Sequence, residues 1–157
     1  MHLIGLILEY QETLYRIAKS RLSCEDDICD VVQNTLISAY KSLHTLKNDN
    51  FFKTWLIKIL INKCNDFYKK NDNNIVSFDT LTHFKETKAK DFTNDFGIDY
   101  LIKSLPNDDQ TILNLYYVEG YNEKEISKIL NLNYATIRTK IRRSKDKIAQ
   151  NLNKEVM

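Results

Sequence analysis

The sequence predicts an all-α protein made of two small helical domains joined by a flexible linker. Glycine occurs three times and proline once in 157 residues, whereas tight-turned all-β folds and phosphate-binding loops need several positions that these residues fill most easily. Apolar residues recur at steps of three and four on both sides of a polar central segment, which is the spacing of amphipathic helices. A chain of this length can form one ordinary domain or two of roughly 60 to 80 residues.

Charge and composition along the chain predict where the domains begin and end. Residues 1–70 hold ten basic and eight acidic residues, and residues 96–157 hold the same numbers. Residues 71–95 hold three basic and five acidic residues, lose the helical spacing and are rich in Asn, Asp, Ser and Thr. This composition is typical of an irregular connection. We expect a first domain at 1–70, a linker at 71–95 and a second domain at 96–157.

The first domain is predicted to contain three helices that share one core. The first helix extends to about Arg21, and its apolar face comprises Ile7, Tyr10, Leu14, Ile17 and Ala18. Ser23, with Asp26 three residues on, resembles a capping box and predicts a second helix. The predicted buried stripe of that helix is Ile28, Val31, Val32, Thr35, Leu36, Ala39, Tyr40 and Leu43. After a polar break at 47–50, a third helix runs from about Phe52 to Lys70, with apolar positions at Trp55, Leu56, Ile59, Leu60 and Phe67.

The second domain opens with two predicted helices. A short helix is expected near Ile98–Ser104. Pro106 then suits the first turn of the next helix, where a missing N–H is tolerated. That helix is expected to run past Tyr116 and stop at Gly120, a residue typical of helix C-caps.

A helix-turn-helix is predicted at the end of the chain. Asn122 and Glu125 have the spacing of a cap for a helix at Glu123–Leu130. Asn131 then occupies the turn position that usually needs a left-handed backbone, which Asn adopts more easily than other non-glycine residues. A last helix from Tyr134 to about Leu152 completes the motif.

The last helix has a strongly basic face. Between Arg138 and Lys147 there are six basic residues and one acid. Ile137, Ile141, Ser144 and Ile148 fall on one side and predict the buried stripe. The opposite side is centred on Ala135, Thr139 and Arg142, with Arg138 and Arg143 beside them and Thr136 and Lys140 at the edges. A charge run is often only a solvated helix face, but after a capped helix and a three-residue turn this one indicates a recognition helix for the DNA major groove.

Several classes of function are not supported by the residues present. The net charge of +2 indicates no particular partner, and no apolar stretch is long enough to span a bilayer. The basic segment and the small-residue cleavage site of a signal peptide are not found near Met1, so we expect a cytoplasmic protein without membrane insertion. The number and spacing of the cysteines fit neither a disulfide framework nor a zinc site. We expect Cys24, Cys29 and Cys64 to be buried small side chains. No arrangement of catalytic or metal-binding residues is found. We expect no enzyme activity, no metal and no cofactor.

Both halves resemble one family, the extracytoplasmic-function (ECF) type of bacterial sigma factors. In the first half, DVVQNTLISAYKSL and FFKTWLIKILINKCNDF are similar to the sigma-two domain of that family. In the second, LPNDDQTILNLYYVEGYNEKEISKILNLNYATIRTKIRRSKDKI is similar to its sigma-four domain. The resemblance implies a factor that gives core RNA polymerase promoter recognition, promoter melting and transcription initiation at a specific regulon. It also implies a possible anti-sigma factor as a partner.

The resemblance also implies roles for individual residues. The face formed by Asp30, Gln33 and Asn34 would bind the β′ clamp helices of polymerase, with the β flap as a further contact. Contacts to the minus-ten element would come from Asn48, Asp49, Asn50, Phe51, Lys58, Asn62 and Lys63, with Asn62 on a flipped base. Contacts to the minus-thirty-five element would come from Tyr134, Ala135, Thr136, Arg138, Thr139, Lys140, Arg142 and Arg143.

The sequence departs from the family pattern at a few positions, and one alternative function stays open. Cys29 and Asn34 stand where members of the family usually carry acids, and Ser127 and Asn131 replace the usual Ala and Gly. These changes imply weaker or differently tuned polymerase docking. The alternative is a conventional helix-turn-helix regulator that binds duplex DNA without contacting polymerase.

Overall fold

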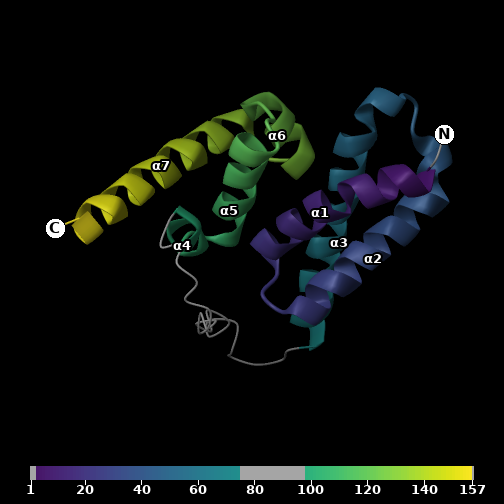
Figure 1. Ribbon diagram of the computed structural model, residues 1–157, viewed down its shortest axis with the longest axis horizontal. Helices are drawn as coiled ribbons and strands as arrows, with labels where there is room; N and C mark the ends of the chain where they lie inside the picture. Colours follow the sequence, from purple (N-terminus) through teal and green to yellow (C-terminus); the bar gives the residue numbers. More distant parts are fainter. Residues whose placement is uncertain (1–2, 75–97, 157) are drawn as a thin grey trace. The chain divides into compact units, whose positions relative to one another are not determined.

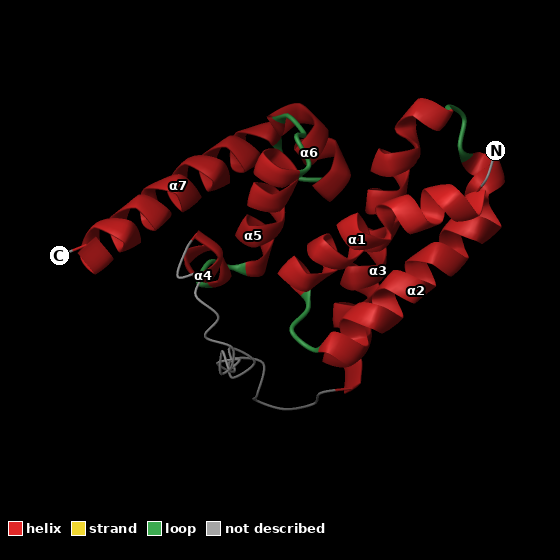
Figure 2. Ribbon diagram, viewed as in Figure 1, coloured by secondary structure: helices red, strands yellow, loops and turns green. Residues whose placement is uncertain are grey.

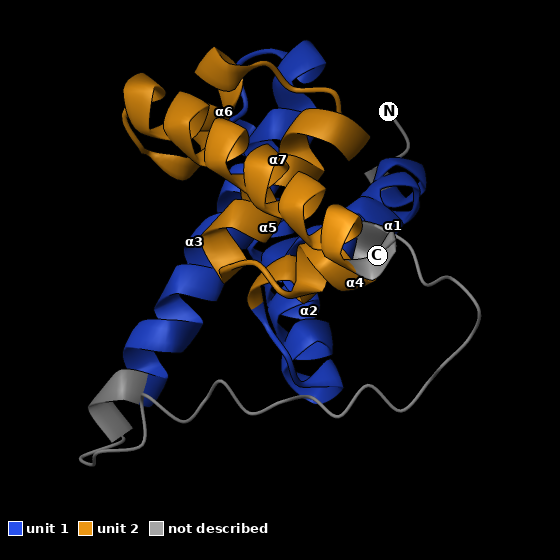
Figure 3. Cartoon of the chain, turned by 90° about the vertical axis from the view of Figure 1, so that its left-hand side faces the viewer, with its two compact units in different colours: residues 1–18, 22–93 blue, residues 19–21, 94–157 orange. Residues whose placement is uncertain are grey.

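The computed structural model describes residues 3–74 and 98–156, and every regular element in these two ranges is helical (Figure 2). The chain divides into two compact units, one of residues 1–18 and 22–93 and the other of residues 19–21 and 94–157 (Figure 3). The predicted all-α fold is confirmed for the described residues. Residues 71–74 of the linker predicted at 71–95 are helical, and its residues 75–95 lie outside the described ranges.

The long helices of the first unit are shown in Figure 1. They are α1 at Leu3–Arg21, α2 at Glu25–Ser42 and α3 at Phe52–Asn74. Between α2 and α3 the chain forms two 3₁₀ turns, Leu43–Thr45 and Asp49–Phe51. The core is the set of apolar side chains on the facing sides of the helices, namely Leu14, Ile17, Ala18, Ile28, Val31, Val32, Ala39, Phe52, Leu56, Ile57, Leu60, Ile61 and Cys64. Removing these side chains from water is the main favourable term in the folding of this unit.

Polar and aromatic contacts fix how α1 meets the other two helices. The Tyr15 hydroxyl donates to both carboxylate oxygens of Glu25, at 2.6 and 2.7 Å. This hydrogen bond raises the pKa of Tyr15, because it stabilises the protonated phenol beside a negative charge. The Phe52 ring lies 5.8 Å from the rings of both Tyr10 and Trp55, centroid to centroid. These contacts hold α1 against the start of both α2 and α3.

Two details of α2 differ from the prediction. Its N-cap is Cys24 and not Ser23, and no side chain caps the helix. The first turn instead contains Glu25, Asp26 and Asp27, whose negative charges favour a helix N-terminus. Tyr40, predicted to be buried, is 69% exposed, because the core ends at Ala39 on that stripe.

The cysteine prediction is wrong at two of three positions. Cys64 is buried, whereas Cys24 and Cys29 are exposed free thiols. Cys24 precedes α2 and Cys29 lies on its outer side, so neither position reaches the core. The third helix is also longer than predicted, since it ends at Asn74 and not near Lys70. It buries Ile57 and Ile61, which the predicted set of apolar positions omitted.

The second unit packs four shorter segments around one long helix. They are α4 at Ile98–Lys103, α5 at Asn107–Leu113, a π-helical turn at Asn114–Val118 and α6 at Glu123–Leu130. The long helix is α7 at Tyr134–Val156, four residues longer than predicted. Helices α4, α5 and α6 all contact α7. The core consists of Leu101, Leu105, Ile112, Leu113, Leu115, Ile126, Ile129, Ile137 and Ile141.

The segment before the helix-turn-helix is less regular than predicted. Pro106 is the N-cap of α5 and does not lie within its first turn. The predicted continuous helix up to Gly120 widens into a π-helical turn, in which the Glu119 N–H donates to the Asn114 carbonyl at 3.0 Å. Gly120 then ends this segment, as predicted, and its φ of +77° is the left-handed conformation common at glycine C-caps.

The predicted helix-turn-helix is confirmed in detail. Asn122 and Glu125 form a capping box, with both hydrogen bonds at 2.9 Å. Asn131 ends α6 in the left-handed conformation, with φ 53°. The Ser127 hydroxyl donates to the Leu132 carbonyl at 2.6 Å and so holds the turn closed. Short-range side-chain chemistry therefore fixes the geometry of this turn.

Candidate nucleic-acid interface

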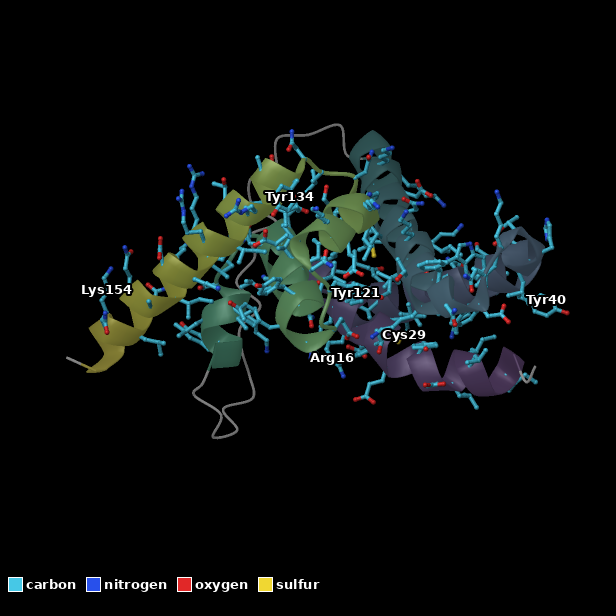
Figure 4. All side chains as sticks on the ribbon, turned by 90° about the horizontal axis from the view of Figure 1, so that it is seen from above. Arg16, Cys29, Tyr40, Tyr121, Tyr134 and Lys154 are labelled. Carbon is cyan, nitrogen blue, oxygen red and sulfur yellow. The ribbon has the colours of Figure 1, made fainter. Side chains whose placement is uncertain are left out.

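The outer face of α7 presents the residues predicted to contact duplex DNA. Ile137, Ile141 and Ser144 are buried, as expected from the helical spacing. Tyr134, Ala135, Thr136, Arg138, Arg142 and Arg143 are exposed, and Thr139 and Lys140 are half-buried. Figure 4 shows the side chain of Tyr134 at the start of this helix. The Asn133 side chain accepts from the Ala135 N–H at 3.0 Å and thereby fixes where the helix begins.

Three of the basic side chains on α7 have partners within the same unit. The Arg138 Nε lies 3.5 Å from a Glu123 carboxylate oxygen, and the Lys140 Nζ lies 3.3 Å from an Asp109 oxygen. The Lys145 Nζ lies 5.5 Å from the centroid of the Tyr117 ring, and a hydrogen bond to Tyr117 raises the pKa of Lys145. The acids of these pairs were not predicted, because helical periodicity gives no information on contacts between different helices.

The side chains of Arg142 and Arg143 have no ion-pair partner within the described ranges 3–74 and 98–156. Arg143 also borders a surface hollow of about 420 Å³, lined by Asp109, Ala135, Thr136, Thr139, Lys140 and Arg143. Five of these six lining residues belong to the predicted minus-thirty-five set. The fold therefore gathers small side chains, hydroxyls and cations on one face, which is the chemistry that base edges and phosphates require.

A second candidate surface lies at the start of α3. The Asn48 side chain accepts from the Asn50 N–H at 3.0 Å and fixes the 3₁₀ turn at Asp49–Phe51. Phe51 is 62% exposed, whereas the next residue, Phe52, is buried. An exposed aromatic ring beside polar groups can stack on an unpaired base.

The remaining residues of that surface lie further along α3. Lys58 and Asn62 are exposed, and Lys63 is half-buried. Lys58 and Asn62 are four residues apart and therefore share one face of the helix. Asn62 lies about three turns, or roughly 16 Å, beyond Phe51 along the helix axis. These residues thus form an elongated surface along α3, with Phe51 at its start and Asn62 about three turns further along.

A third surface lies on α2. Asp30, Gln33 and Asn34 are exposed together on its outer side, as expected from the buried stripe. Of these three, Gln33 also lines a groove of about 400 Å³ between α1 and α2. The other lining residues are Leu8, Gln11, Glu12, Tyr15, Cys29, Val32 and Leu36. Figure 4 labels Cys29 and Tyr40 on this helix. The groove was not predicted, because the apolar pattern does not distinguish side chains in the core from those at its open edge.

Two other kinds of site are not found in the part of the chain that the structure describes. No group of three or more His, Cys, Asp or Glu side chains there could hold a metal ion. Within the same residues, no helix is both long enough and apolar enough to cross a lipid bilayer.

The helix-turn-helix, with its exposed basic second helix, defines a DNA-binding protein, and comparison with known proteins gives its family. Residues 6–74 match the family described as Sigma-70 region 2, and residues 96–148 match Sigma-70, region 4. The two matches follow each other in the same order as the two units.

Relatives and solved structures agree with these matches. The chain is 29% identical to RNA polymerase sigma factor SigV of Bacillus subtilis over 153 residues, covering 98% of this chain and 92% of the relative. It is 27% identical to the ECF RNA polymerase sigma-E factor of Escherichia coli, covering 91% of this chain and 82% of the relative. The fold is similar to that of the sigma factor RpoE in complex with the anti-sigma factor NepR from Bartonella quintana. For that structure the TM-score is 0.77, the identity is 21% and the coverage is 95% of both chains.

The chain belongs to the sigma-70 family, and within it to the ECF type. It is therefore an RNA polymerase sigma factor, which directs core polymerase to promoter DNA at the initiation of transcription. Sigma factors are regulators without a catalytic reaction of their own. The matches favour this function over that of a conventional helix-turn-helix regulator, because the first unit also matches a sigma domain.

Proposed function

We propose that the two units divide promoter recognition between duplex and melted DNA. The main support for this proposal is the exposed face of α7, where Ala135 and Arg142 lie on the side opposite the buried residues of the same helix. A second exposed surface on α3 and its preceding turn offers an aromatic ring and an amide. We further propose that the predicted domains at 1–70 and 96–157 are separate functional units, the first extended to the end of α3 at Asn74, with the rest of 71–95 between them.

The second unit binds the minus-thirty-five element as duplex. The N-terminal half of α7 enters the major groove, where Arg side chains can pair with guanine through two hydrogen bonds and Thr139 can donate or accept. The nearby cations bind phosphates and give the complex its salt dependence. The contacting residues are Tyr134, Ala135, Thr136, Arg138, Thr139, Lys140, Arg142 and Arg143.

The first unit binds the minus-ten element once its strands have separated. Asn62 hydrogen-bonds the Watson–Crick edge of a flipped base, and Phe51 offers a stacking surface. Asn48, Asp49 and Asn50 complete the turn beside Phe51. Lys58 and Lys63 bind the backbone of the single strand. The exposure of Phe51, Lys58 and Asn62 supports this role.

Core polymerase binds the outer face of α2. Asp30, Gln33 and Asn34 contact the β′ clamp helices, and the second unit contacts the β flap. An anti-sigma factor can occlude these faces, and a solved structure with this fold, that of the sigma factor RpoE in complex with the anti-sigma factor NepR, supports a partner of this kind. The chain acts in the cytoplasm, where polymerase and the chromosome meet, and catalyses no reaction itself.

In vitro transcription with purified core polymerase tests this function. The wild-type chain plus core enzyme should initiate from a cognate promoter, whereas core enzyme alone should not. Arg142→Ala should weaken binding to the minus-thirty-five duplex by about 1–3 kcal/mol, because one bidentate base contact is lost. Arg16→Ala is a matched control, since Arg16 is a basic residue of the first unit on α1 and outside all three surfaces. No initiation by the wild-type chain at any promoter would contradict the proposal.

A further inference from the structure

One arginine on the recognition helix is held from two sides by residues outside the buried core. The Nε of Arg138 lies 3.5 Å from Glu123 Oε2, and its guanidinium carbon lies 5.8 Å from the centroid of the Tyr134 ring. Glu123 is the first residue of α6, and Tyr134 is the first residue of α7. The packing of α6 against α7 brings Glu123 beside Arg138, whereas Tyr134 lies four residues before Arg138 on α7 itself. The contact with Glu123 is therefore a product of the helix-turn-helix geometry, and the contact with Tyr134 is a product of the helical repeat.

These contacts restrain Arg138 without covering it. Its side chain is 64% exposed, whereas that of Glu123 is 28% exposed. The ion pair engages Nε, and no other ion pair of Arg138 is found among the described residues. The two Nη groups thus stay available as donors, and two parallel N–H donors are what bidentate pairing with guanine requires. A side chain already held in place loses less rotamer freedom when it binds.

The charge of Glu123 acts differently on the two classes of DNA contact. A phosphate that approaches Arg138 also meets the Glu123 carboxylate, so their repulsion offsets part of the attraction to the guanidinium. A guanine edge carries no net charge and meets no such repulsion. An acid at this position therefore weakens contacts to DNA phosphates more than contacts to base edges. Specificity rises when binding to non-promoter DNA is weakened more than binding to the promoter.

We propose that Glu123 and Tyr134 are positioning residues that direct Arg138 to a guanine edge in the major groove and away from phosphates. This inference rests on the proposed role of α7 in duplex recognition. The neighbouring pair of Lys140 and Asp109 provides an internal comparison. Its nitrogen and oxygen lie 3.3 Å apart, but a lysine ammonium is a point charge without a bidentate match to a base.

The test uses the complete holoenzyme and a series of promoter duplexes that carry single base-pair changes in the minus-thirty-five element. Discrimination is the ratio of the affinities for the original and the changed base pair. Arg138→Ala first identifies the base pair that Arg138 reads, as the position where this ratio falls by roughly 5- to 150-fold. Glu123→Gln keeps the side-chain length but removes the charge. Glu123→Asp keeps a charge in the first turn of α6 but is one methylene shorter.

Both Glu123 variants should lower discrimination at that base pair by about 2- to 12-fold, the cost of ordering one long side chain again. Glu123→Gln should also tighten binding to non-promoter duplex, with a salt dependence steeper by about one released counterion. Tyr134→Leu should lower discrimination at the same base pair. In an Arg138→Ala background, none of these changes should alter discrimination at that base pair. Asp109→Asn should tighten overall binding and leave discrimination unchanged.

Two results would overturn the inference. One is unchanged discrimination in both Glu123 variants, and the other is an equal loss of binding to every sequence that persists in the Arg138→Ala background. The second result would identify Glu123 as a residue needed only for the stability of α6. Failure of the proposed function is distinguishable, because Arg138→Ala and Arg142→Ala would then leave binding to the minus-thirty-five duplex unaffected.

Discussion

Asn62 is the residue at which duplex recognition and strand separation can be told apart. Its side chain is exposed on α3, far along the helix from the turn that carries Phe51. Asn62→Ala should leave binding to a minus-thirty-five duplex unchanged, since that contact belongs to the other unit. It should lower open-complex formation on a duplex promoter, because a hydrogen bond to the flipped base no longer offsets the cost of unpairing.

The measurement for Asn62 is open-complex formation by holoenzyme on two templates. A template with a pre-melted bubble should partly rescue Asn62→Ala, because the unpairing cost is already met there. Asn65→Ala on the same helix is a matched amide control, since Asn65 is outside the proposed surface. An equal defect of Asn62→Ala on the bubble template and on the isolated minus-thirty-five duplex would contradict the proposed division between the units.

The Ser127 side chain contributes one hydrogen bond to the helix-turn-helix. Its hydroxyl donates to the Leu132 carbonyl at 2.6 Å, across the turn. Ser127→Ala should destabilise the motif by about 0.5–1 kcal/mol, because the loss of a net 0.5–1.5 kcal/mol hydrogen bond is partly offset by the better helix propensity of Ala. Amide hydrogen exchange at residues 123–133 should become faster. Lys128→Ala, a change at an exposed position of the same helix, should leave these exchange rates unchanged. Equal exchange rates in the wild type and in Ser127→Ala would contradict the prediction.

Residues whose role depends on local chemistry could be predicted from the sequence. The capping box of Asn122 and Glu125 and the left-handed Asn131 follow from spacing and backbone preference within a few residues. The exposure of Tyr40 and the pairing of Arg138 with Glu123 could not be predicted in this way. They depend on where a core ends and on how two helices meet, and neither is encoded in helical spacing.

At the level of elements, the junction between α5 and α6 combines a predicted and an unpredicted feature. Gly120 ends the segment as expected, with φ +77°. The π-helical turn at Asn114–Val118 was not predicted, because a one-residue widening leaves the average apolar spacing almost intact. Such turns are tolerated where packing on a neighbouring helix determines which side chains face inward. Here Leu115 is fully buried, while Tyr117 and Val118 are exposed.

Gly120→Ala tests whether the backbone conformation alone requires glycine at this junction. A Cβ at this position would meet no atom within 4 Å, so steric clash adds nothing to the effect. The left-handed conformation costs an L-residue about 1–2 kcal/mol in the folded state. The lower conformational entropy of the unfolded chain with Ala offsets about 0.4–1 kcal/mol of this destabilisation. The net destabilisation should be about 1 kcal/mol in urea-induced unfolding. Gly120→Asn should cost less, and a cost for Asn equal to that for Ala would contradict this explanation.

At the level of the whole molecule, the two proposed DNA surfaces lie in separate compact units. Each surface is small, and the chain carries a net charge of only +2, so bulk electrostatic attraction to DNA is weak. Two linked contacts strengthen each other only when the distance between them matches the target. Core polymerase can supply that match by binding both units at once. Promoter affinity should therefore be a property of the holoenzyme and not of the free chain.

Titration of a labelled promoter duplex with the chain alone, and then with the chain plus core polymerase, tests this last prediction. The free chain should bind in the non-specific range of about 10⁻⁴–10⁻⁶ M, with affinity that falls steeply as salt is raised, because phosphate contacts dominate. With core polymerase, binding should become tight and depend on the promoter sequence. A scrambled duplex of the same length and composition is the control. Tight and sequence-specific binding by the free chain would contradict the prediction, because a single unit would then suffice for promoter recognition, as in a conventional helix-turn-helix regulator.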